Sequence, residues 1–263
     1  MVEADLGQAI GPINWLAYNV KKAPLDDVRV RKAINYALDR DFIVNVLLQG
    51  QVETAPGPIV PGSPLANANV ENYDLDIDKA NALLDEAGHP AGADGIRFTL
   101  TGDVTNGGEE MGRNLLDYMK SQLRKVGINV EIRVAPDFPT WAQRISNYDY
   151  DMTIDKVFNW GDPVIGVNRT YISSNIRPGV IWSNTQQYEN TKVDELLASA
   201  ATEVDPEKRK ALYDEFQEIV VDETPIYFLN VIPYNTVYKK GLVGVPDGIW
   251  GPVSPMDDLR WEE

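Results

Sequence analysis

The sequence predicts an α/β fold, and three observations support this prediction. Residues 97–157 alternate between strand-like and helix-like patterns, in the order strand, helix, strand, helix, strand. Within this run, Glu109–Val126 carries apolar residues at four-residue intervals, as an amphipathic helix does, and Ile128–Val134 alternates as a half-buried strand does. The hydrophobic fraction of 43% and the charged fraction of 24% are ordinary for a globular protein. These features indicate a sheet whose strands are joined by helical crossovers.

Before this run, the sequence predicts one strand and two helices. Ile13–Asn19 is rich in large apolar and aromatic residues, which is typical of a strand. Asp26 or Asp27 can then cap a helix. The apolar face of that helix consists of Val30, Ala33, Ile34, Ala37 and Leu38. A second helical segment, Asp41–Leu48, ends before Gly50.

A loop with four prolines and two glycines follows at residues 55–64. It fits either a linker between domains or a rigid, ordered surface loop, and its apolar centre Ile59-Val60 favours the ordered loop. Further on, the alternating acids of Asp74–Asp78 resemble a calcium-binding loop. However, an EF-hand needs Gly where Lys79 stands, and capping of a helix at Asp78–Ala87 explains these acids.

The rest of the chain completes the predicted order of elements. The remaining elements of the central run are the strand Arg97–Thr101, the helix Trp141–Ser146 and the strand Tyr150–Val157. Residues 158–190 hold little regular pattern but are rich in Trp, Tyr and Asn. Two helices and two strands then follow, at Lys192–Thr202, Pro206–Val221, Ile226–Val231 and Asn235–Tyr238.

Charge and composition exclude several classes of function. The 24 basic and 40 acidic residues give a formal net charge of −16, which argues against binding to nucleic acid or to anionic membrane surfaces. The absence of cysteine excludes disulfides, thiolate metal sites and cysteine nucleophiles. Apolar runs such as Phe42–Leu48 are too short to span a membrane. Because Met1–Asp5 has neither a basic nor an apolar leader segment, an exported protein would carry its export signal upstream of this segment.

The sequence also lacks the usual catalytic residues. His89 is the one histidine, and it lies between a helix-ending glycine and a proline, where we expect it to face solvent. A Ser-His-Asp triad with a nucleophile elbow, a phosphate loop and a dinucleotide fingerprint are all missing. We therefore predict no catalytic residue, no metal ligand and no cofactor. A hydrolase that uses paired carboxylates stays open as an alternative of another class, because forty acidic residues do not single out a pair.

One segment of the sequence resembles a known family. Lys21–Val44 (KKAPLDDVRVRKAINYALDRDFIV) resembles the segment that opens the large second lobe of oligopeptide-, dipeptide- and nickel-type (family 5) solute-binding proteins of ABC importers. The family pattern is filled by Asn19, Pro24, Asp27, Val30, Arg31, Ala33, Ile34, Ala37, Leu38, Asp39 and Arg40. We predict that Asp27, Asp39 and Arg40 identify the family through structural roles and do not bind ligand.

Further motifs match the family in the same order. Lys79-Ala80 with Leu83–Gly88 resembles its Lys-Ala-x-x-Leu-Leu-x-Glu-Ala-Gly, and Gln122–Ile128 resembles the segment before its next strand. Tyr148–Met152 resembles its Tyr-Asp tract, and Asn190–Arg209 matches its Asn-x-x-Val-Asp-x-Leu followed by Asp-x-x-x-Arg. The resemblance extends over about residues 19–231.

The resemblance implies a fold, a domain organisation and a function. The fold would be periplasmic-binding-protein-like (type II, cluster C), a second lobe with a mixed sheet flanked by helices. Residues 1–20 would form a hinge and first-lobe strand, residues 21–222 the second ligand-binding lobe, and residues 223–263 a return toward the first lobe. The chain would be a fragment, namely the second lobe of a periplasmic substrate-binding component.

The same resemblance implies partners and a mechanism. The protein would capture a peptide, an opine or another peptide-like solute by hinge closure and deliver it to an ABC permease of the inner membrane. The first lobe of the same protein would be a further partner, and nucleic acid would not be a partner. A sugar oligomer is an alternative solute because aromatic and amide side chains are abundant, and a sensory or scaffold module without transport is a further alternative.

The resemblance places the ligand-facing wall near Asn159, Trp160 and Asp162. An aromatic ring offers apolar area and a cation–π surface, and a nearby acid can pair an ammonium group. Asp162 can equally be a helix cap followed by Pro163, and Trp160 can equally be core. In peptide-binding members an Asp a few residues before Asp-Pro holds the amino terminus of the peptide; here Asn159 stands there, and an amide lacks the charge for that salt bridge.

A second group of candidate ligand-binding residues follows in the irregular region. It consists of Arg169, Tyr171 and Trp182. The planar guanidinium of Arg169 can clamp a carboxylate through two parallel hydrogen bonds. The alternative is that Arg169 braces a long loop through backbone carbonyls.

Overall fold

The computed structural model describes residues 2–5, 11–105, 110–232, 235–246 and 254–262. The strands are β1 (Val2–Asp5), β2 (Pro12–Tyr18), β3 (Phe98–Thr105), β4 (Ile128–Ala135), β5 (Met152–Phe158), β6 (Ile226–Val231), β7 (Asn235–Tyr238), β8 (Leu242–Val243) and β9 (Arg260–Trp261). The α-helices are α2 (Val28–Tyr36), α3 (Arg40–Phe42), α4 (Ile77–Glu86), α5 (Glu110–Arg124), α6 (Phe138–Ser146), α7 (Pro163–Gly166), α8 (Asn168–Tyr171), α9 (Thr191–Thr202) and α10 (Pro206–Glu223).

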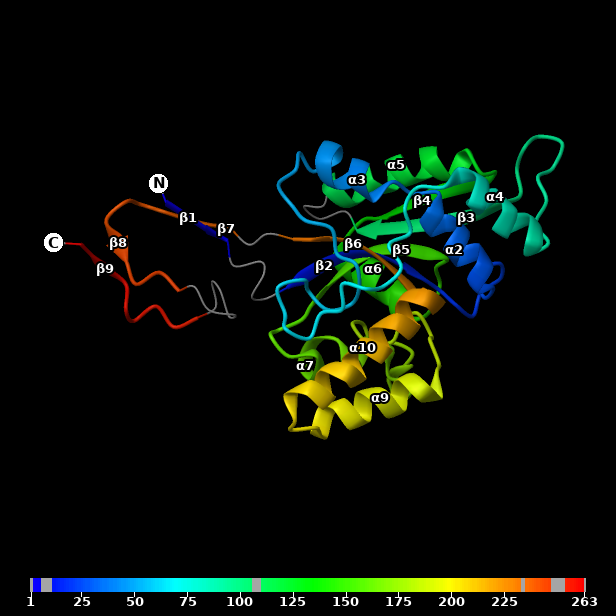
Figure 1. Cartoon of the computed structure of the whole chain (residues 1–263). Helices are drawn as coiled ribbons and strands as arrows, with labels where there is room; N and C mark the ends of the chain where they lie inside the picture. Colours follow the sequence, from blue (N-terminus) through cyan, green and yellow to red (C-terminus); the bar gives the residue numbers. More distant parts are fainter. Residues whose placement is uncertain (1, 6–10, 106–109, 233–234, 247–253, 263) are drawn as a thin grey trace.

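A five-stranded mixed sheet forms the centre of the fold, with the strand order β4-β3-β5-β2-β6. β3 pairs in parallel with both β4 and β5, whereas β2 runs antiparallel to both of its neighbours, β5 and β6. The crossover through α5 moves one strand along the sheet and the crossover through α6 moves back, so right-handed connections place these helices on opposite faces. Figure 1 shows α5 on one side of the sheet and α9 and α10 on the other. The predicted α/β class and mixed sheet are confirmed.

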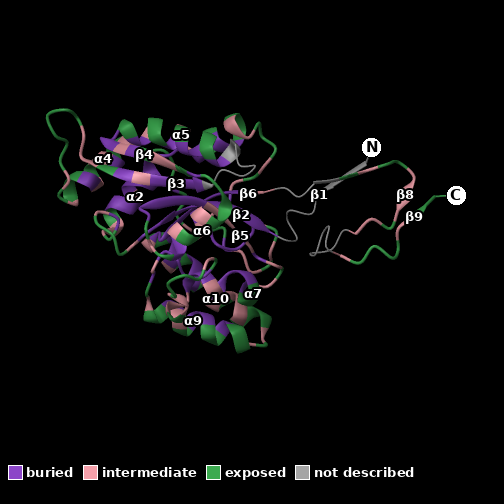
Figure 2. Ribbon diagram, turned by 180° about the vertical axis from the view of Figure 1, so that it is seen from behind, coloured by how far each residue is buried: buried purple, intermediate pink, exposed green. Residues whose placement is uncertain are grey.

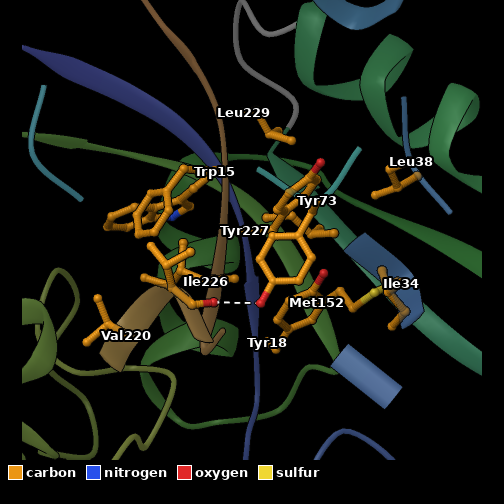
Figure 3. Packing of buried hydrophobic residues seen from close by; sticks show 14 of the residues in the cluster. Trp15, Tyr18, Ile34, Leu38, Tyr73, Met152, Val220, Ile226, Tyr227 and Leu229 are labelled. Carbon is orange, nitrogen blue, oxygen red and sulfur yellow. Dashed lines mark hydrogen bonds between the residues drawn. The ribbon is translucent and has the colours of Figure 1, made fainter. Parts of the chain in front are cut away.

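The core lies on both faces of the strands, and the exposed residues lie on the outward sides of the helices (Figure 2). β2 is buried along its whole length. Figure 3 shows side chains of β2, β5, β6 and α2 meeting in one cluster. This cluster includes Trp15, Tyr18, Ile34, Met152, Tyr227 and Leu229. A middle strand that is buried on both faces matches the segment rich in large apolar and aromatic residues from which it was predicted.

The family motif around α2 and α3 holds the fold together. Asp27 and Asp39 are the N-caps of α2 and α3, and each accepts a hydrogen bond from a backbone N–H in the first turn. Arg40 is buried, and its Nη1 donates to the carbonyls of Ala55 (3.0 Å) and Phe228 (3.2 Å). The predicted structural roles of these three residues are therefore confirmed.

The structure also tests two predictions for the first hundred residues, namely the proline-rich loop and the acidic run before α4. The centre of the proline-rich loop is buried, with Ile59 and Val60 in the core, so residues 55–64 are an ordered part of the lobe and not a linker. Asp76 is the N-cap of α4, where its side chain accepts from the N–H of Lys79. Capping thus accounts for this part of the acidic run. The described residues contain no group of three or more His, Cys, Asp or Glu that could hold a metal ion.

The helix expected at Asp41–Leu48 is present in a different form. A short α-helix, α3, continues into a π-helix over Ile43–Leu47. A π-helix widens the hydrogen-bonded turn by one residue, which a regular apolar spacing does not reveal. None of the helices in the described part of the chain is long and apolar enough to cross a membrane.

Four short strands lie away from the central sheet. β1 pairs with β7, and β8 pairs with β9 (Figure 1). β2 and β6, which lie in residues 1–20 and 223–263 of the predicted division, belong to the central sheet. The division into a hinge strand, a second lobe and a return toward the first lobe stays a prediction.

Candidate functional site

A pocket of about 420 Å³ opens beside the end of β5. Its walls come from α6, β5, the β5–α7 loop, α8 and the irregular segment after α8. The lining residues are Phe138, Trp141, Ile154, Asp155, Lys156, Phe158, Trp160, Arg169 and Trp182. A concave, largely aromatic site with a few charged groups has the composition of a small-molecule site.

Two stacked aromatic pairs form most of the apolar wall. The rings of Phe158 and Trp160 lie 5.1 Å apart at 20°, and those of Phe138 and Trp182 lie 5.6 Å apart at 26°. Trp182 is 48% exposed and Phe138 is 43% exposed, so these two rings present a large apolar area to solvent. Below them, Trp141 is buried, and its Nε1 donates to the hydroxyl of Thr153 at 3.1 Å. The base of the pocket is therefore fixed, and its rim presents exposed aromatic rings.

The backbone at both rim tryptophans is unusual. Trp160 and Trp182 each have φ near +55°, in the left-handed region that bulky residues rarely adopt. Such conformations cost about 1–3 kcal/mol each and tend to gather at ligand-binding positions. The fold thus holds these two side chains in place against a local preference.

Close packing under the pocket depends on Gly166 at the end of α7. A Cβ at this position would lie 2.2 Å from the carbonyl oxygen of Phe158 and 2.5 Å from that of Asn159. No side chain can be accommodated at such distances. Gly166 therefore lets α7 pack directly on the backbone that carries Phe158 and leads to Trp160.

The two charged side chains whose positions bear on binding are Arg169 and Asp155. Arg169 is half-buried on α8, and its Nε is buried without a hydrogen-bond partner among the described residues. Burial lowers the pKa of the Arg169 guanidinium, and the negative charge of Asp155 opposes this effect. Asp155 is half-buried on β5 and accepts a hydrogen bond from the N–H of Lys156 at 2.7 Å. The aromatic pocket therefore contains charges of both signs.

A buried ionic cluster anchors the helix that carries Phe138 and Trp141. The carboxylate of Asp103 is fully buried on β3 and pairs with Arg133 of β4 and Arg144 of α6. Arg133 donates to it through Nε at 3.1 Å and Nη2 at 2.7 Å. One carboxylate thus joins two strands and α6 directly behind the pocket.

The structure brings three of the six predicted ligand-binding residues together. Trp160, Arg169 and Trp182 all line the pocket. Asn159 lies beside it but is 3% exposed, and its amide is occupied: Oδ1 accepts from the N–H of Val60 (2.7 Å) and Nδ2 donates to the carbonyl of Pro58 (3.2 Å). These contacts favour a bracing role for Asn159 on the proline-rich loop.

The other two predicted residues, Asp162 and Tyr171, lie outside the pocket lining. Asp162 is the N-cap of α7 and accepts from Nη2 of Arg209 at 2.9 and 3.0 Å. Tyr171 is 1% exposed, and its ring packs against Phe216 in the core. The capping alternative for Asp162 is therefore present in the structure, and ligand contact by either residue stays a prediction.

The Asp162–Arg209 pair predicts a pH dependence of stability. Burial raises the pKa of Asp162, but hydrogen bonds from Arg209 and from the Val164 backbone outweigh it and lower the pKa below its ordinary value of 3.8. The stabilisation is then present above the ordinary pKa and is lost as the pH falls through the lower, folded-state value. In Asp162→Asn we expect unfolding free energy to fall by at most about 1 kcal/mol at neutral pH, since the pair is partly exposed.

Denaturant unfolding between pH 2.5 and pH 7 checks this expectation. The loss caused by Asp162→Asn should shrink at the acidic end, where the wild-type carboxylate is also uncharged. A loss that stays constant over the whole range would contradict an ionic contribution. The exposed pair Arg113–Asp117 on α5, 3.7 Å apart, provides a matched control through Asp117→Asn.

Six lining residues were not among the predicted ligand-binding residues: Phe138, Trp141, Ile154, Asp155, Lys156 and Phe158. The sequence offered a signal for two sets of them, since Phe138 starts a helix capped by Asp137, and the charged pair Asp155-Lys156 stands between the apolar residues Ile154 and Val157 of β5. What the pattern lacks is the information that α6 and α8 approach the same end of β5. That arrangement depends on contacts between elements far apart in the sequence.

The pocket and its fold now allow comparison with known proteins. The model of bacterial extracellular solute-binding proteins, family 5 (middle region), matches residues 6–178. The chain belongs to this family. The glutathione-binding protein GsiB of Salmonella paratyphi A is 30% identical over 236 residues, which cover 88% of the chain and 44% of that protein. The heme-binding protein A of Haemophilus influenzae is 29% identical over 217 residues, 81% of the chain and 38% of that protein.

A solved structure shows the same fold at lower sequence identity. The periplasmic binding protein DppA from Helicobacter pylori, solved in complex with the peptide STSA, superposes with a TM-score of 0.84 at 24% identity. The superposition covers 100% of the present chain and 49% of DppA. The chain thus spans about half of this structure, and less than half of GsiB and of heme-binding protein A. The predicted family and the periplasmic-binding-protein-like fold are confirmed.

Proposed function

We propose that the chain is a ligand-binding lobe of the substrate-binding component of an ABC importer, and that the solute is a peptide or a peptide-like compound. The observation that carries this proposal is the aromatic pocket at the end of β5, built by the fold of family 5. GsiB is a glutathione-binding protein and DppA was solved with a tetrapeptide, so two relatives handle peptide-like ligands. Periplasmic location and delivery to a permease follow from the same family membership.

The mechanism proposed for this lobe is capture followed by closure. The exposed ring of Trp182 and the half-buried ring of Trp160 offer apolar area that a solute can cover, and a second lobe can seal the other side. A conformational change of this kind needs a solute that binds the closed form better than the open one. In this account residues 21–222, together with β2 and β6, form one of the two lobes that close on the solute. The chain performs no covalent chemistry.

Binding to the pocket is tested by titrating the chain with a peptide library and a library of neutral oligosaccharides, followed by intrinsic tryptophan fluorescence and calorimetry. We expect weak peptide binding, with Kd in the range of about 1 mM, because one lobe supplies only part of the contacts. Replacing both rim residues (Trp160→Ala and Trp182→Ala) should weaken that binding by about tenfold or more, given the stacking area removed. Val180→Ala, at an exposed position near Trp182, is the control and should bind like the wild type.

Two outcomes would contradict the proposal. Binding that survives the double tryptophan replacement would place the site elsewhere, and micromolar affinity of the chain alone would refute the two-lobe account. Preference for neutral oligosaccharides would favour the second candidate, a carbohydrate receptor, for which the aromatic rim is equally suited. Among the described residues that line the pocket, Asp155 is the one carboxylate, so a hydrolase with paired acids lacks its second acid there.

A further inference from the structure

Arg169 holds an unusual position in the pocket. It belongs to α8 and lines the cavity together with Asp155, Trp160 and Trp182. Its Nε is buried, yet it has no hydrogen-bond partner in the part of the chain that the structure describes. The buried arginines Arg31 and Arg40 behave differently, because each donates to several backbone carbonyls.

An arginine in this situation requires an acceptor. A guanidinium has five N–H donors in a planar fork, and a buried donor left unpaired costs free energy in the folded protein. Burial lowers the pKa of Arg169, which reflects the same loss of solvation, although the group remains charged at neutral pH. The sequence left open that Arg169 braces a loop by donating to backbone carbonyls. Among the described residues, no carbonyl accepts a hydrogen bond from its Nε. The site is therefore charged, partly desolvated and incompletely paired before any solute binds.

Resting on the proposed function, we propose that Arg169 binds a carboxylate of the solute and thereby makes the pocket selective for anionic over neutral ligands. A carboxylate matches the planar fork with two parallel hydrogen bonds. The stacked pairs Phe158–Trp160 and Phe138–Trp182 line the same pocket and provide apolar walls for the group that carries the carboxylate. Selectivity thus comes from the guanidinium of Arg169, and affinity comes from the rings.

The charge of Asp155 also affects which anions can bind beside Arg169. Its charge acts on Arg169, and a second anion must enter a field that already contains one carboxylate. Repulsion by Asp155 is smaller for a monovalent carboxylate than for a dianionic phosphate or sulfate, whereas the lining cations Arg169 and Lys156 attract every anion. The solute class is accordingly a carboxylic acid. A peptide carboxyl terminus and a sugar acid share this chemistry.

The test uses pairs of probes in which an anionic carboxylate is compared with its neutral amide or ester. The first pair is N-acetyl-alanyl-phenylalanine and its C-terminal amide, and the second is digalacturonic acid and its methyl ester. Each is titrated by calorimetry and tryptophan fluorescence into the wild-type chain, Arg169→Gln, Arg169→Lys and Arg177→Gln. Arg177 is exposed and lies outside the pocket lining, so Arg177→Gln removes the same charge at a distance.

In the wild type and in Arg177→Gln we expect the acid of at least one pair to bind about tenfold or more tightly than its neutral counterpart, as for a charge-assisted hydrogen bond. Arg169→Gln should bring that ratio close to one, and Arg169→Lys should give an intermediate ratio because it keeps the charge but not the fork. Which pair shows the effect tells whether the carboxylate belongs to a peptide or to a sugar acid.

The remaining outcomes separate the two proposals. Equal binding of acid and neutral forms by the wild type, with affinity still dependent on Trp160 and Trp182, overturns the role of Arg169 and leaves the proposed function intact. A preference for the acid that persists in Arg169→Gln also overturns it. If the wild type binds neither form of either pair and no member of the peptide and oligosaccharide libraries, the proposed function fails, and the assignment of Arg169 fails with it.

Discussion

Replacing Asp103 with alanine should lower the free energy of unfolding by roughly 3–5 kcal/mol, the cost of leaving buried opposite charges without their partner. The Asp103 side chain is fully buried and holds Arg133 of β4 and Arg144 of α6 at once. Its removal takes this carboxylate from both guanidinium groups, and Arg133 keeps only the carbonyl of Asp149 (2.6 Å) as a close acceptor. A loss of this size is a large part of the total stability of a typical domain.

Equilibrium denaturation in urea measures this effect as a lower urea concentration at the unfolding midpoint. The slope of the unfolding free energy against urea concentration should stay the same. Asp117→Ala, which breaks an exposed pair on α5, is the matched control and should change the unfolding free energy by no more than about 0.5 kcal/mol. Combining Asp103→Ala with Arg144→Met should recover part of the loss, because one of the two unpaired charges disappears. A loss under about 1 kcal/mol for Asp103→Ala would contradict the view that this cluster anchors α6.

Gly166→Ala should damage the pocket although Gly166 is not one of its lining residues. The added methyl group would lie 2.2 Å from the carbonyl oxygen of Phe158, so either α7 or the end of β5 has to move. We expect unfolding free energy to fall by about 1–3 kcal/mol, as for overpacking of a close-packed site. Because the displaced backbone leads into Trp160, the near-ultraviolet circular dichroism of the aromatic residues should change as well, and N-acetyl-alanyl-phenylalanine binding should weaken.

A second glycine provides the control for this substitution. A Cβ on Gly57 would meet only Val221 at 3.7 Å and Gln217 at 3.8 Å, which are ordinary contacts. Gly57→Ala should therefore leave the aromatic dichroism unchanged and alter stability much less. Equal effects of the two substitutions would mean that a general loss of glycine flexibility is responsible, and that the contact between α7 and β5 does not control the pocket.

The sequence predicted the order of the elements well because each depends on local patterns. Helices such as α9 and α10 begin at side-chain caps, Asn190 and Asp205, that are visible in the sequence. The π-helix at Ile43–Leu47 was missed because its extra residue per turn is decided by packing. The domain boundaries were harder to predict, since nothing local shows that β6 returns to pair with β2.

The candidate site was predicted only in part, for a related reason. Trp160, Arg169 and Trp182 stood out by residue type in an irregular segment, and the structure places all three on one pocket. Asn159 also stood out, but its partner is the backbone of Val60, 99 positions away, and this contact turns the side chain toward the proline-rich loop. Residue type suggests what a side chain can bind, whereas long-range packing decides which partner it meets.

The position of β2 in the sheet has a consequence for how the chain acquires its structure. β2 is near the beginning of the sequence, but both of its neighbours are distant: β5 begins at residue 152 and β6 at residue 226. During synthesis the parallel pair β3–β4 can form early, whereas β2 keeps one edge open until β6 has emerged. Closure over such long sequence separations is slow and leaves an apolar strand exposed. We therefore expect the nascent chain to depend on protection of residues 12–18 until residues 226–231 arrive.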